Sequence, residues 1–244
     1  GGTLILRDED LDPERSKAEY EAAMAEDLRW LGIRWDEGPD VGGPCGPYAQ
    51  SERRAFYLEM WRKLIAGGWL YPCRCSRKEL SRIAQAPHDD PNAGRMEGDE
   101  GPMYPGTCRV ERAAAARLAE EFAGPAGVNW RLRVPDGEVV AVEDGHFGTQ
   151  RFVAGEDVGD GVGCRRDDVP AYQLAVVADD RAMGITEVVR GADLLLSTAR
   201  QILLYRALGW EPPRWFHCEL VTDARGERLA KRHDALSLRA LRAQ

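Results

Sequence analysis

Residues 4–15 read Leu-Ile-Leu-Arg-Asp-Glu-Asp-Leu-Asp-Pro-Glu-Arg, an apolar run that passes into an acidic turn and a proline. Residues 4–6 are short and continuously apolar, as a buried strand is. Asp12 and Pro13 then supply a helix N-cap and a proline suited to the first helical turn. We therefore expect a strand that leads directly into a helix, and this alternation is typical of α/β folds.

Further amphipathic helices are predicted outward from this stretch. Their apolar residues recur at spacings of three and four, which places them on one helix face, and a glycine follows each helix. A capping box at Ser76 and Glu79 predicts the start of another short helix. The apolar positions are Tyr20, Met24, Leu28 and Leu31 in the first helix and Phe56, Met60 and Leu64 in the second, and a third helix covers 197–208.

Strand patterns fill the middle and the later part of the chain. Residues 128–134 alternate between apolar and polar, as a half-buried strand does. Segments 171–178 and 185–189 are more continuously apolar and are predicted as strands covered on both faces. Segment 86–106 is polar and rich in proline and glycine, which predicts a long irregular excursion. Together these patterns predict a doubly wound parallel sheet interrupted by an insertion.

Composition narrows the class of protein. The 244 residues carry a formal net charge of −8 and are 43% hydrophobic, enough to bury a substantial core. No signal-peptide pattern and no apolar stretch of roughly 20 residues is present, so we expect a cytoplasmic protein that does not enter a membrane. The acidic net charge argues against tight non-specific binding to nucleic acid. The protein could still carry a basic face, because two segments are basic, 165–166 and 225–242. Each is equally well interpreted as a basic patch or as a solvated helix face.

Six cysteines are too few and too unevenly placed for a disulfide scaffold. Reduced thiols or a metal site are expected instead.

Seven short motifs occur along the chain in order. They are the acidic run at 6–15, Gly-Pro-Tyr-Ala-Gln-Ser-Glu-Arg at 46–53, Tyr-Pro-Cys-Arg-Cys-Ser at 71–76, Tyr-Pro-Gly-Thr-Cys-Arg at 104–109, Pro-Ala-Tyr-Gln-Leu at 170–174, Val-Val-Arg-Gly at 188–191 and Arg-Leu-Ala-Lys-Arg at 228–232. Together they resemble the class I glutamyl-tRNA synthetase family, and most closely its shortened glutamyl-Q branch.

The resemblance implies an α/β catalytic body with a Rossmann-like parallel sheet, divided into three parts. Residues 1–70 would form a Rossmann-like part with the acidic glutamate-binding motif. Residues 71–165 would form a zinc-containing α+β insertion that binds the tRNA acceptor end. Residues 166–244 would form the second Rossmann half.

Three residues are implied to bind the substrate L-glutamate. Glu9 would hold its ammonium group, since an ammonium in a partly desolvated pocket needs a carboxylate partner. Arg190 would bind a carboxylate with its planar fork, and Tyr172 would line the same pocket. From the residues alone, the favoured interpretation is a solvated acidic turn for Glu9, a surface salt bridge for Arg190 and a core aromatic for Tyr172.

Residues 228–232 resemble the Lys-Met-Ser-Lys-Ser signature of class I synthetases. Lys231 stands at the second lysine and would act in catalysis and ATP binding, because charge builds on the leaving pyrophosphate and a cation there stabilises it. Arg228 replaces the first lysine and keeps the charge, whereas Ala230 replaces serine and removes a hydroxyl. A basic tail on a surface hairpin is the alternative interpretation.

Cys73, Cys75, Tyr104 and Cys108 match the Cys-x-Cys…Tyr-x-x-x-Cys arrangement that binds zinc in the glutamyl-Q branch. Three thiolates and a phenolate would close a tetrahedral structural site. A Cys-x-Cys pair alone also occurs by chance. Ordinary glutamyl-tRNA synthetases tend to finish this site with Cys-x-His, and Cys108 lacks that continuation.

The family's His-Ile-Gly-His-type motif is absent, so we expect the first strand–helix unit of the sheet to be missing, and the segment after Lys231 is short. The preferred hypothesis is a monomer that activates glutamate with Mg-ATP and transfers it to the queuosine base of tRNA(Asp). Two alternatives are the catalytic part of an ordinary enzyme charging tRNA(Glu), and an inactive zinc-stabilised tRNA-binding relic.

Overall fold

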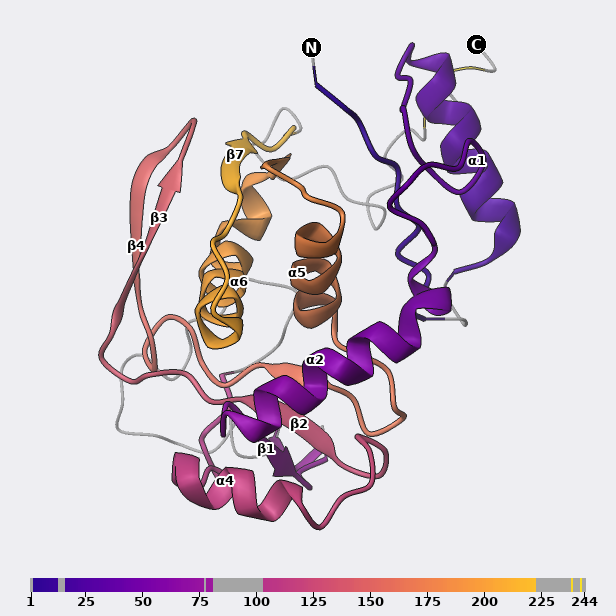
Figure 1. The fold of residues 1–244 in the computed structure, drawn as a ribbon. Coiled ribbons are helices and arrows are strands. Elements are labelled where there is room, and N and C mark those ends of the chain that lie inside the picture. The colour runs from indigo at the N-terminus through magenta and orange to yellow at the C-terminus, as the bar shows by residue number, and fades with distance from the viewer. Residues whose placement is uncertain are drawn as a thin grey trace. The chain divides into compact units, whose positions relative to one another are not determined.

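The computed structural model describes residues 2–12, 16–76, 78–80, 103–222, 238 and 242. The chain divides into two compact units, one formed by 1–54 with 219–244 and the other by 55–218. Figure 1 shows the helices and strands of each unit. The loop at 228–232, with Lys231, lies outside the described residues.

The first unit is built around the extended stretch that opens the chain. Backbone bonds join Leu6 N–H to the Glu37 carbonyl (2.8 Å) and Asp8 N–H to the Tyr48 carbonyl (2.9 Å). Isolated parallel bridges pair Ile5 with Glu37 and Asp8 with Ala49. The predicted strand is therefore an extended segment with bridges to two neighbouring stretches.

The first predicted helix is present but begins later than expected. α1 covers Ala18–Trp30, with Lys17 at its N-cap, so the predicted start at Asp12 is wrong. Asp12 does accept a backbone bond from Ser16 N–H at 2.8 Å, but the continuous helix starts two residues further on. No residue of α1 is fully buried.

The second unit contains two sheets. One is antiparallel, in the order β1 (Leu70–Cys73), β2 (Asn129–Leu132), β5 (Val162–Cys164). The other is mixed, in the order β4 (Gly148–Val153), β3 (Val139–Asp144), β7 (Arg214–Cys218), β6 (Glu187–Gly191). In the mixed sheet β3 and β4 form an antiparallel hairpin, whereas β7 runs parallel to both β3 and β6. Parallel pairing, as an α/β fold requires, is thus found in β3, β7 and β6.

Among the described residues of this unit, the longer helices are α2 (Arg54–Ala66), α4 (Arg112–Ala119), α5 (Tyr172–Ala182) and α6 (Leu195–Leu208). Helices α5 and α6 pack against each other, α6 also packs on β3, and α4 packs on β1 (Figure 1). As predicted, Gly209 ends α6 in the left-handed conformation, at φ 70°. The predicted capping box is also confirmed, since Glu79 accepts from Ser76 N–H (2.7 Å) and Ser76 Oγ accepts from Glu79 N–H (3.2 Å).

The segment 171–178 is a helix, and its prediction as a strand is wrong. Within α5, residues 173–180 are all buried. A helix that is buried all round shows a continuous apolar run rather than a 3.6-residue period, and periodicity cannot distinguish it from a buried strand. The predicted strand at 185–189, in contrast, overlaps β6 at residues 187–189.

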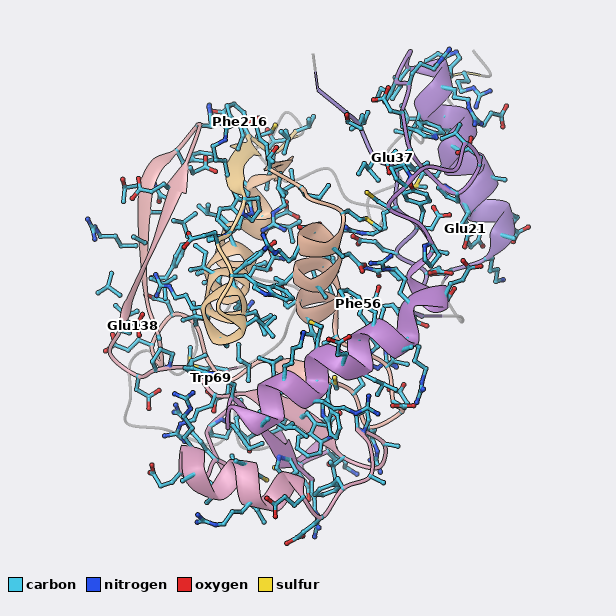
Figure 2. All side chains as sticks on the ribbon, viewed as in Figure 1. Glu21, Glu37, Phe56, Trp69, Glu138 and Phe216 are labelled. Carbon is cyan, nitrogen blue, oxygen red and sulfur yellow. The ribbon has the colours of Figure 1, made fainter. Side chains whose placement is uncertain are left out.

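A β–α–β unit brings distant side chains together at one end of the mixed sheet. Chain order runs β6, the 3-10 helix η2 (Ala192–Leu194), α6 and β7, and β6 and β7 are adjacent and parallel. Their register places Arg190 directly beside His217. Figure 2 shows Phe216, the neighbour of His217, at one end of the sheet and Glu138 at the opposite end of the β3–β4 hairpin.

The antiparallel sheet contributes Trp130 to an aromatic core. Trp130 of β2 is fully buried, and its ring meets those of Trp61 and Phe122 edge-on, each with ring centres 5.0 Å apart. Edge-to-face pairs of this kind add about 0.5–1.5 kcal/mol of stabilisation beyond that of the buried area.

Among the described residues, no helix is both long and apolar enough to cross a bilayer.

Candidate functional site

Arg190 is held near the carboxyl end of β6 by three uncharged acceptors. Its Nη2 donates to Thr198 Oγ1 at 2.6 Å and to Gln201 Oε1 at 2.8 Å, both on α6. Its Nε donates to His217 Nε2 at 3.3 Å, across to β7. Ligands of open parallel sheets bind at the carboxyl ends of the strands, so this guanidinium stands where substrate is expected.

His217 is in turn fixed by Asp144, the last residue of β3. The distance from His217 Nδ1 to Asp144 Oδ2 is 2.6 Å, and both side chains are fully buried. Asp144 Oδ1 also accepts the backbone N–H groups of His146 and Phe147 at 3.0 and 2.9 Å. Burial alone would raise the pKa of Asp144, but these donors and His217 hold it below its ordinary value, so the carboxylate is ionised.

The network extends from Arg190 to α5. Gln201 Nε2 donates to the buried Gln173 Oε1 at 2.9 Å, and Gln173 follows Tyr172 at the start of that helix. Tyr172 itself is 39% exposed. Of the predicted glutamate-binding residues, Tyr172 and Arg190 therefore lie in the same unit, joined through the first turn of α5.

Glu9 belongs to the other unit. Its carboxylate is 41% exposed and accepts from Arg7 Nη2 at 3.2 Å. The neighbouring Asp10 is anchored, because Ser51 donates to it through its backbone N–H (2.8 Å) and its hydroxyl (2.5 Å). The acidic run is thus attached to the 3-10 helix η1 (Gln50–Arg53), with the Glu9 side chain on the surface of this unit.

The four predicted metal ligands lie together in the antiparallel part of the second unit. The sulfur atoms of Cys73, Cys75 and Cys108 lie within 4.8 Å of one another, with Cys75 and Cys108 3.6 Å apart. Tyr104 Oη lies 3.5 Å from Cys73 Sγ. Bonds of about 2.3 Å to sulfur and about 2.0 Å to oxygen in a tetrahedral zinc site would separate two sulfurs by about 3.8 Å and sulfur from oxygen by about 3.5 Å. The donor set therefore fits zinc.

The protonation chemistry of this cluster also suits a cation. Burial and the neighbouring thiols raise the pKa of Cys75 to about 11. The pKa of Cys108 is lowered. Burial alone would raise it, but hydrogen bonds with Tyr104, the Arg74 backbone and the other two thiols outweigh the effect of burial. A bound metal would displace the proton that the raised pKa of Cys75 retains.

A buried arginine adjoins the cluster. Arg131 of β2 donates from Nε to Cys73 Sγ at 3.3 Å and from Nη1 to the Asp160 carbonyl at 2.8 Å. Its guanidinium carbon also lies 3.8 Å from the centre of the Tyr104 ring. This cation faces two of the four ligands, where it offsets the negative charge of a thiolate.

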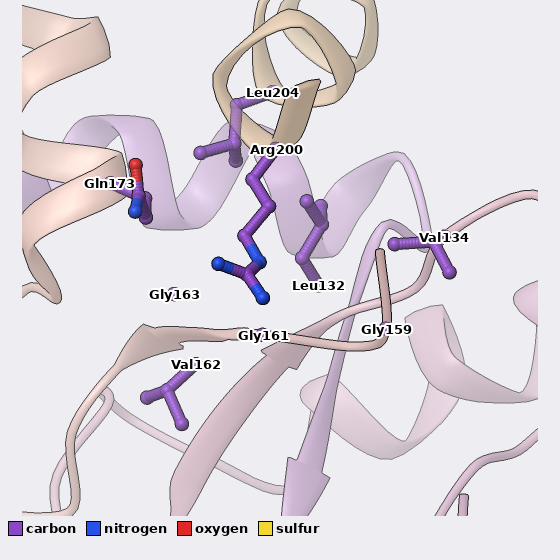
Figure 3. Close-up of a pocket in the computed structure, with 9 residues that line it drawn as sticks. All are labelled: Leu132, Val134, Gly159, Gly161, Val162, Gly163, Gln173, Arg200 and Leu204. Carbon is purple, nitrogen blue, oxygen red and sulfur yellow. The ribbon is translucent and has the colours of Figure 1, made fainter. Parts of the chain in front are cut away.

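A small pocket between α6 and the β2–β5 region shares Gln173 with the Arg190 network. Figure 3 shows Arg200 of α6 extending over a glycine-rich segment that includes Gly161, with Leu132 and Leu204 beside it. Among the predicted site residues that the structure describes, none lines this pocket. It is mostly apolar and does not fit an amino acid with two carboxylates.

His217, Asp144 and Arg131 are the polar residues that the sequence pattern did not single out. No histidine was given a role from sequence, because the four are scattered along the chain. The alternation of buried and exposed residues along a strand could have identified His217 as a buried residue. His217 and Trp215 alternate with exposed residues on β7, and both are buried.

Comparison with known proteins identifies the family of the chain. Residues 1–243 match the family described as tRNA synthetases class I (E and Q), catalytic domain. The glutamyl-Q tRNA(Asp) synthetase of Nitratidesulfovibrio vulgaris is 52% identical over 99% of this chain and 71% of the relative. That of Symbiobacterium thermophilum is 51% identical over 100% of this chain and 72% of the relative.

Ordinary glutamate–tRNA ligases are also similar. Relatives with that name are 40–44% identical, and the chain spans 45–49% of their length. The crystal structure of glutamate–tRNA synthetase from Elizabethkingia anophelis matches with a TM-score of 0.77 at 30% identity, covering 95% of this chain and 46% of that one. The chain therefore belongs to the class I tRNA synthetase (E and Q) catalytic-domain family.

Proposed function

We propose that the chain activates L-glutamate with Mg-ATP and transfers it to the queuosine base of tRNA(Asp). A glutamate carboxylate oxygen attacks the α-phosphorus of ATP and pyrophosphate leaves. The queuosine base then takes the glutamyl group from the adenylate, and AMP leaves. Arg190 and Tyr172 bind glutamate, Glu9 holds its ammonium, and Lys231 neutralises the leaving phosphates.

The fixed position of Arg190 is the observation that carries glutamate binding. Three neutral acceptors orient its guanidinium at the carboxyl end of a parallel strand. The guanidinium keeps its positive charge, which attracts a carboxylate, and these bonds hold it in one orientation. A substrate carboxylate would therefore meet a cation that needs little rearrangement.

Two observations favour queuosine over an ordinary tRNA terminus. Identity is 51–52% with the glutamyl-Q relatives, against 40–44% with the glutamate–tRNA ligases. In addition, Tyr104 and Cys108 complete the cysteine cluster without a Cys-x-His pair. The second candidate is charging of tRNA(Glu), and the fold match to glutamate–tRNA synthetase favours it.

We also propose that Cys73, Cys75, Tyr104 and Cys108 hold a structural Zn²⁺. The distances among the donor atoms support this role, and the cluster packs in a small core with Tyr71 and Ala115. Bound zinc would tie β1 to the segment that carries Tyr104 and Cys108.

Pyrophosphate exchange dependent on glutamate and ATP, measured with and without tRNA, tests activation. Exchange with glutamate but not with glutamine or aspartate supports the proposal, and no exchange under either condition overturns it in favour of a tRNA-binding protein without ATP chemistry. Lys231→Ala should slow exchange by orders of magnitude, because an unneutralised pyrophosphate is a poor leaving group.

Transfer is tested with labelled glutamate and three RNAs. Glutamylation of queuosine-containing tRNA(Asp), with none of the unmodified tRNA(Asp), is the expected result. Charging of tRNA(Glu) alone would replace the preferred function with the second candidate.

A further inference from the structure

A chain of hydrogen-bonded side chains crosses three neighbouring strands and consists of Asp144, His217 and Arg190. His217 of β7 lies beside Arg190 of β6 in register, and Asp144 ends β3 on the other side of β7. The contacts run in sequence, 2.6 Å from Asp144 Oδ2 to His217 Nδ1 and 3.3 Å from Arg190 Nε to His217 Nε2. Because all three residues stand on strands, their spacing is set by the sheet.

The hydrogen-bond pattern selects one form of the imidazole. An ionised carboxylate only accepts, so His217 must carry a proton on Nδ1 to donate to Asp144. Nε2 then keeps its lone pair and accepts from Arg190 Nε. The Thr198 hydroxyl lies 3.0 Å from the same nitrogen. A proton on Nε2 could be accepted by Thr198 Oγ1 but would also face the Arg190 N–H, and these two donors would repel each other.

We propose that Asp144 and His217 are positioning residues that fix the orientation of the Arg190 guanidinium for a glutamate carboxylate. Asp144 holds His217 as the Nδ1–H tautomer, and His217 Nε2 holds Arg190 Nε. The inference rests on the proposed function, in which Arg190 binds glutamate.

The chemistry of the three acceptors explains why a histidine suits this position. His217 Nε2, Thr198 Oγ1 and Gln201 Oε1 are uncharged, so they orient the guanidinium without neutralising it. A carboxylate at position 217 would form an ion pair with Arg190 and compete with the substrate for its positive charge. The negative charge of Asp144 is separated from Arg190 by the imidazole ring.

Asp144→Asn is the most discriminating variant because it preserves shape. An asparagine oxygen can accept from only one side, and its NH₂ must face either His217 Nδ1 or the N–H groups of His146 and Phe147. Facing Nδ1, it donates there and moves the histidine proton to Nε2, against Arg190. Facing the turn, it opposes two backbone donors.

The variants Asp144→Asn, His217→Ala and His217→Gln are compared with the parent chain in glutamate-dependent pyrophosphate exchange. The first two should raise the KM for glutamate by about tenfold or more, the equivalent of one charge-assisted hydrogen bond, and leave the KM for ATP nearly unchanged. His217→Gln should recover part of the loss, since its amide oxygen can accept from Arg190. Tyr57→Phe, which removes a buried hydrogen bond to Asp179 far along α5, is the control and should leave the glutamate KM unchanged.

The ¹⁵N chemical shifts of the His217 ring supply a readout independent of activity. The parent should show a protonated Nδ1 and an unprotonated Nε2, and Asp144→Asn should reverse them. A parent with the proton on Nε2, or variants whose glutamate KM equals that of the parent, would overturn the positioning role while leaving glutamate activation intact. A parent without any glutamate-dependent exchange would overturn the proposed function itself, and the positioning role with it.

Discussion

Replacing Arg131 by methionine should weaken zinc binding at the cysteine cluster. The guanidinium donates to Cys73 Sγ at 3.3 Å and lies 3.8 Å from the Tyr104 ring centre, so it contacts two of the proposed ligands. Methionine fills a similar volume and keeps the apolar contacts of the side chain. It removes the positive charge that offsets the thiolates.

The size of the effect follows from the lost contacts. A hydrogen bond between a charged donor and a thiolate contributes about 1.5–3 kcal/mol, and a desolvated cation–π contact contributes up to about 2 kcal/mol. Part of this loss falls on the metal-free protein too, because the Asp160 carbonyl loses its bond from Nη1 in both states. The part specific to the zinc-bound state is about 1.4–2.7 kcal/mol, or a 10–100-fold weaker zinc affinity.

The assay is competition for Zn²⁺ against a fluorescent chelator, with metal content measured on the purified protein. Arg112→Met is the matched control, because Arg112 also stacks on an aromatic ring (Trp69, 3.7 Å) and donates to a backbone carbonyl (Gly67, 2.6 Å) without touching a sulfur. Arg131→Lys should fall between parent and methionine. Unchanged zinc affinity in Arg131→Met, or an equal loss in Arg112→Met, would refute the charge-balance argument.

Three further predictions concern stability in urea unfolding. Gly68→Ala should lower the free energy of unfolding by at least about 2 kcal/mol, because φ is +68° and a Cβ would collide with the Arg112 carbonyl oxygen in α4. Gly184→Ala, where φ is +65° and the space around a Cβ is open, should lower it by about 1 kcal/mol. Equal losses in the two variants would contradict the collision. Tyr57→Phe should cost about 1–3 kcal/mol because the buried Asp179 loses its 2.8 Å donor, and no change would show that the bond contributes nothing. The pKa of Asp144 is lowered in the folded protein, so its ionised carboxylate contributes its full stabilisation above about pH 4, and this stabilisation is lost as the pH falls through the lowered pKa. The difference in unfolding free energy between the parent and Asp144→Asn should therefore shrink on acidification. A difference that grows on acidification would contradict this reasoning.

Local patterns predicted the elements that carry their own signal. The amphipathic helix around Met60, the capping box at Ser76 and the C-cap at Gly209 all occur as expected. The segment 171–178 failed because α5 is buried on all sides, which removes the period that distinguishes a helix. The start of α1 failed because a cap and a proline permit a helix start without requiring one.

The sequence predicted a group of neighbouring side chains where a motif has a recognisable spacing, and it missed a group that the fold assembles from distant strands. Cys73 and Cys75 are near neighbours in sequence, and the structure brings Tyr104 and Cys108 to them as expected. Asp144 and His217 are 73 residues apart, and only the pairing of β3 with β7 brings them together. No local pattern encodes that pairing.

If Arg190 binds glutamate as proposed, the β6–α6–β7 segment supplies the substrate-binding cation in a fixed orientation. Arg190, Thr198 and Gln201 come from consecutive elements of the β6–α6–β7 unit, and β7 adds His217. A loop arginine would lose side-chain freedom on binding, whereas this one is already ordered by its neighbours before substrate arrives. Uncharged acceptors order the guanidinium and still leave it able to attract a carboxylate. The selection of an acidic amino acid would then depend on the sheet register that aligns Arg190 with His217 as much as on Arg190 itself.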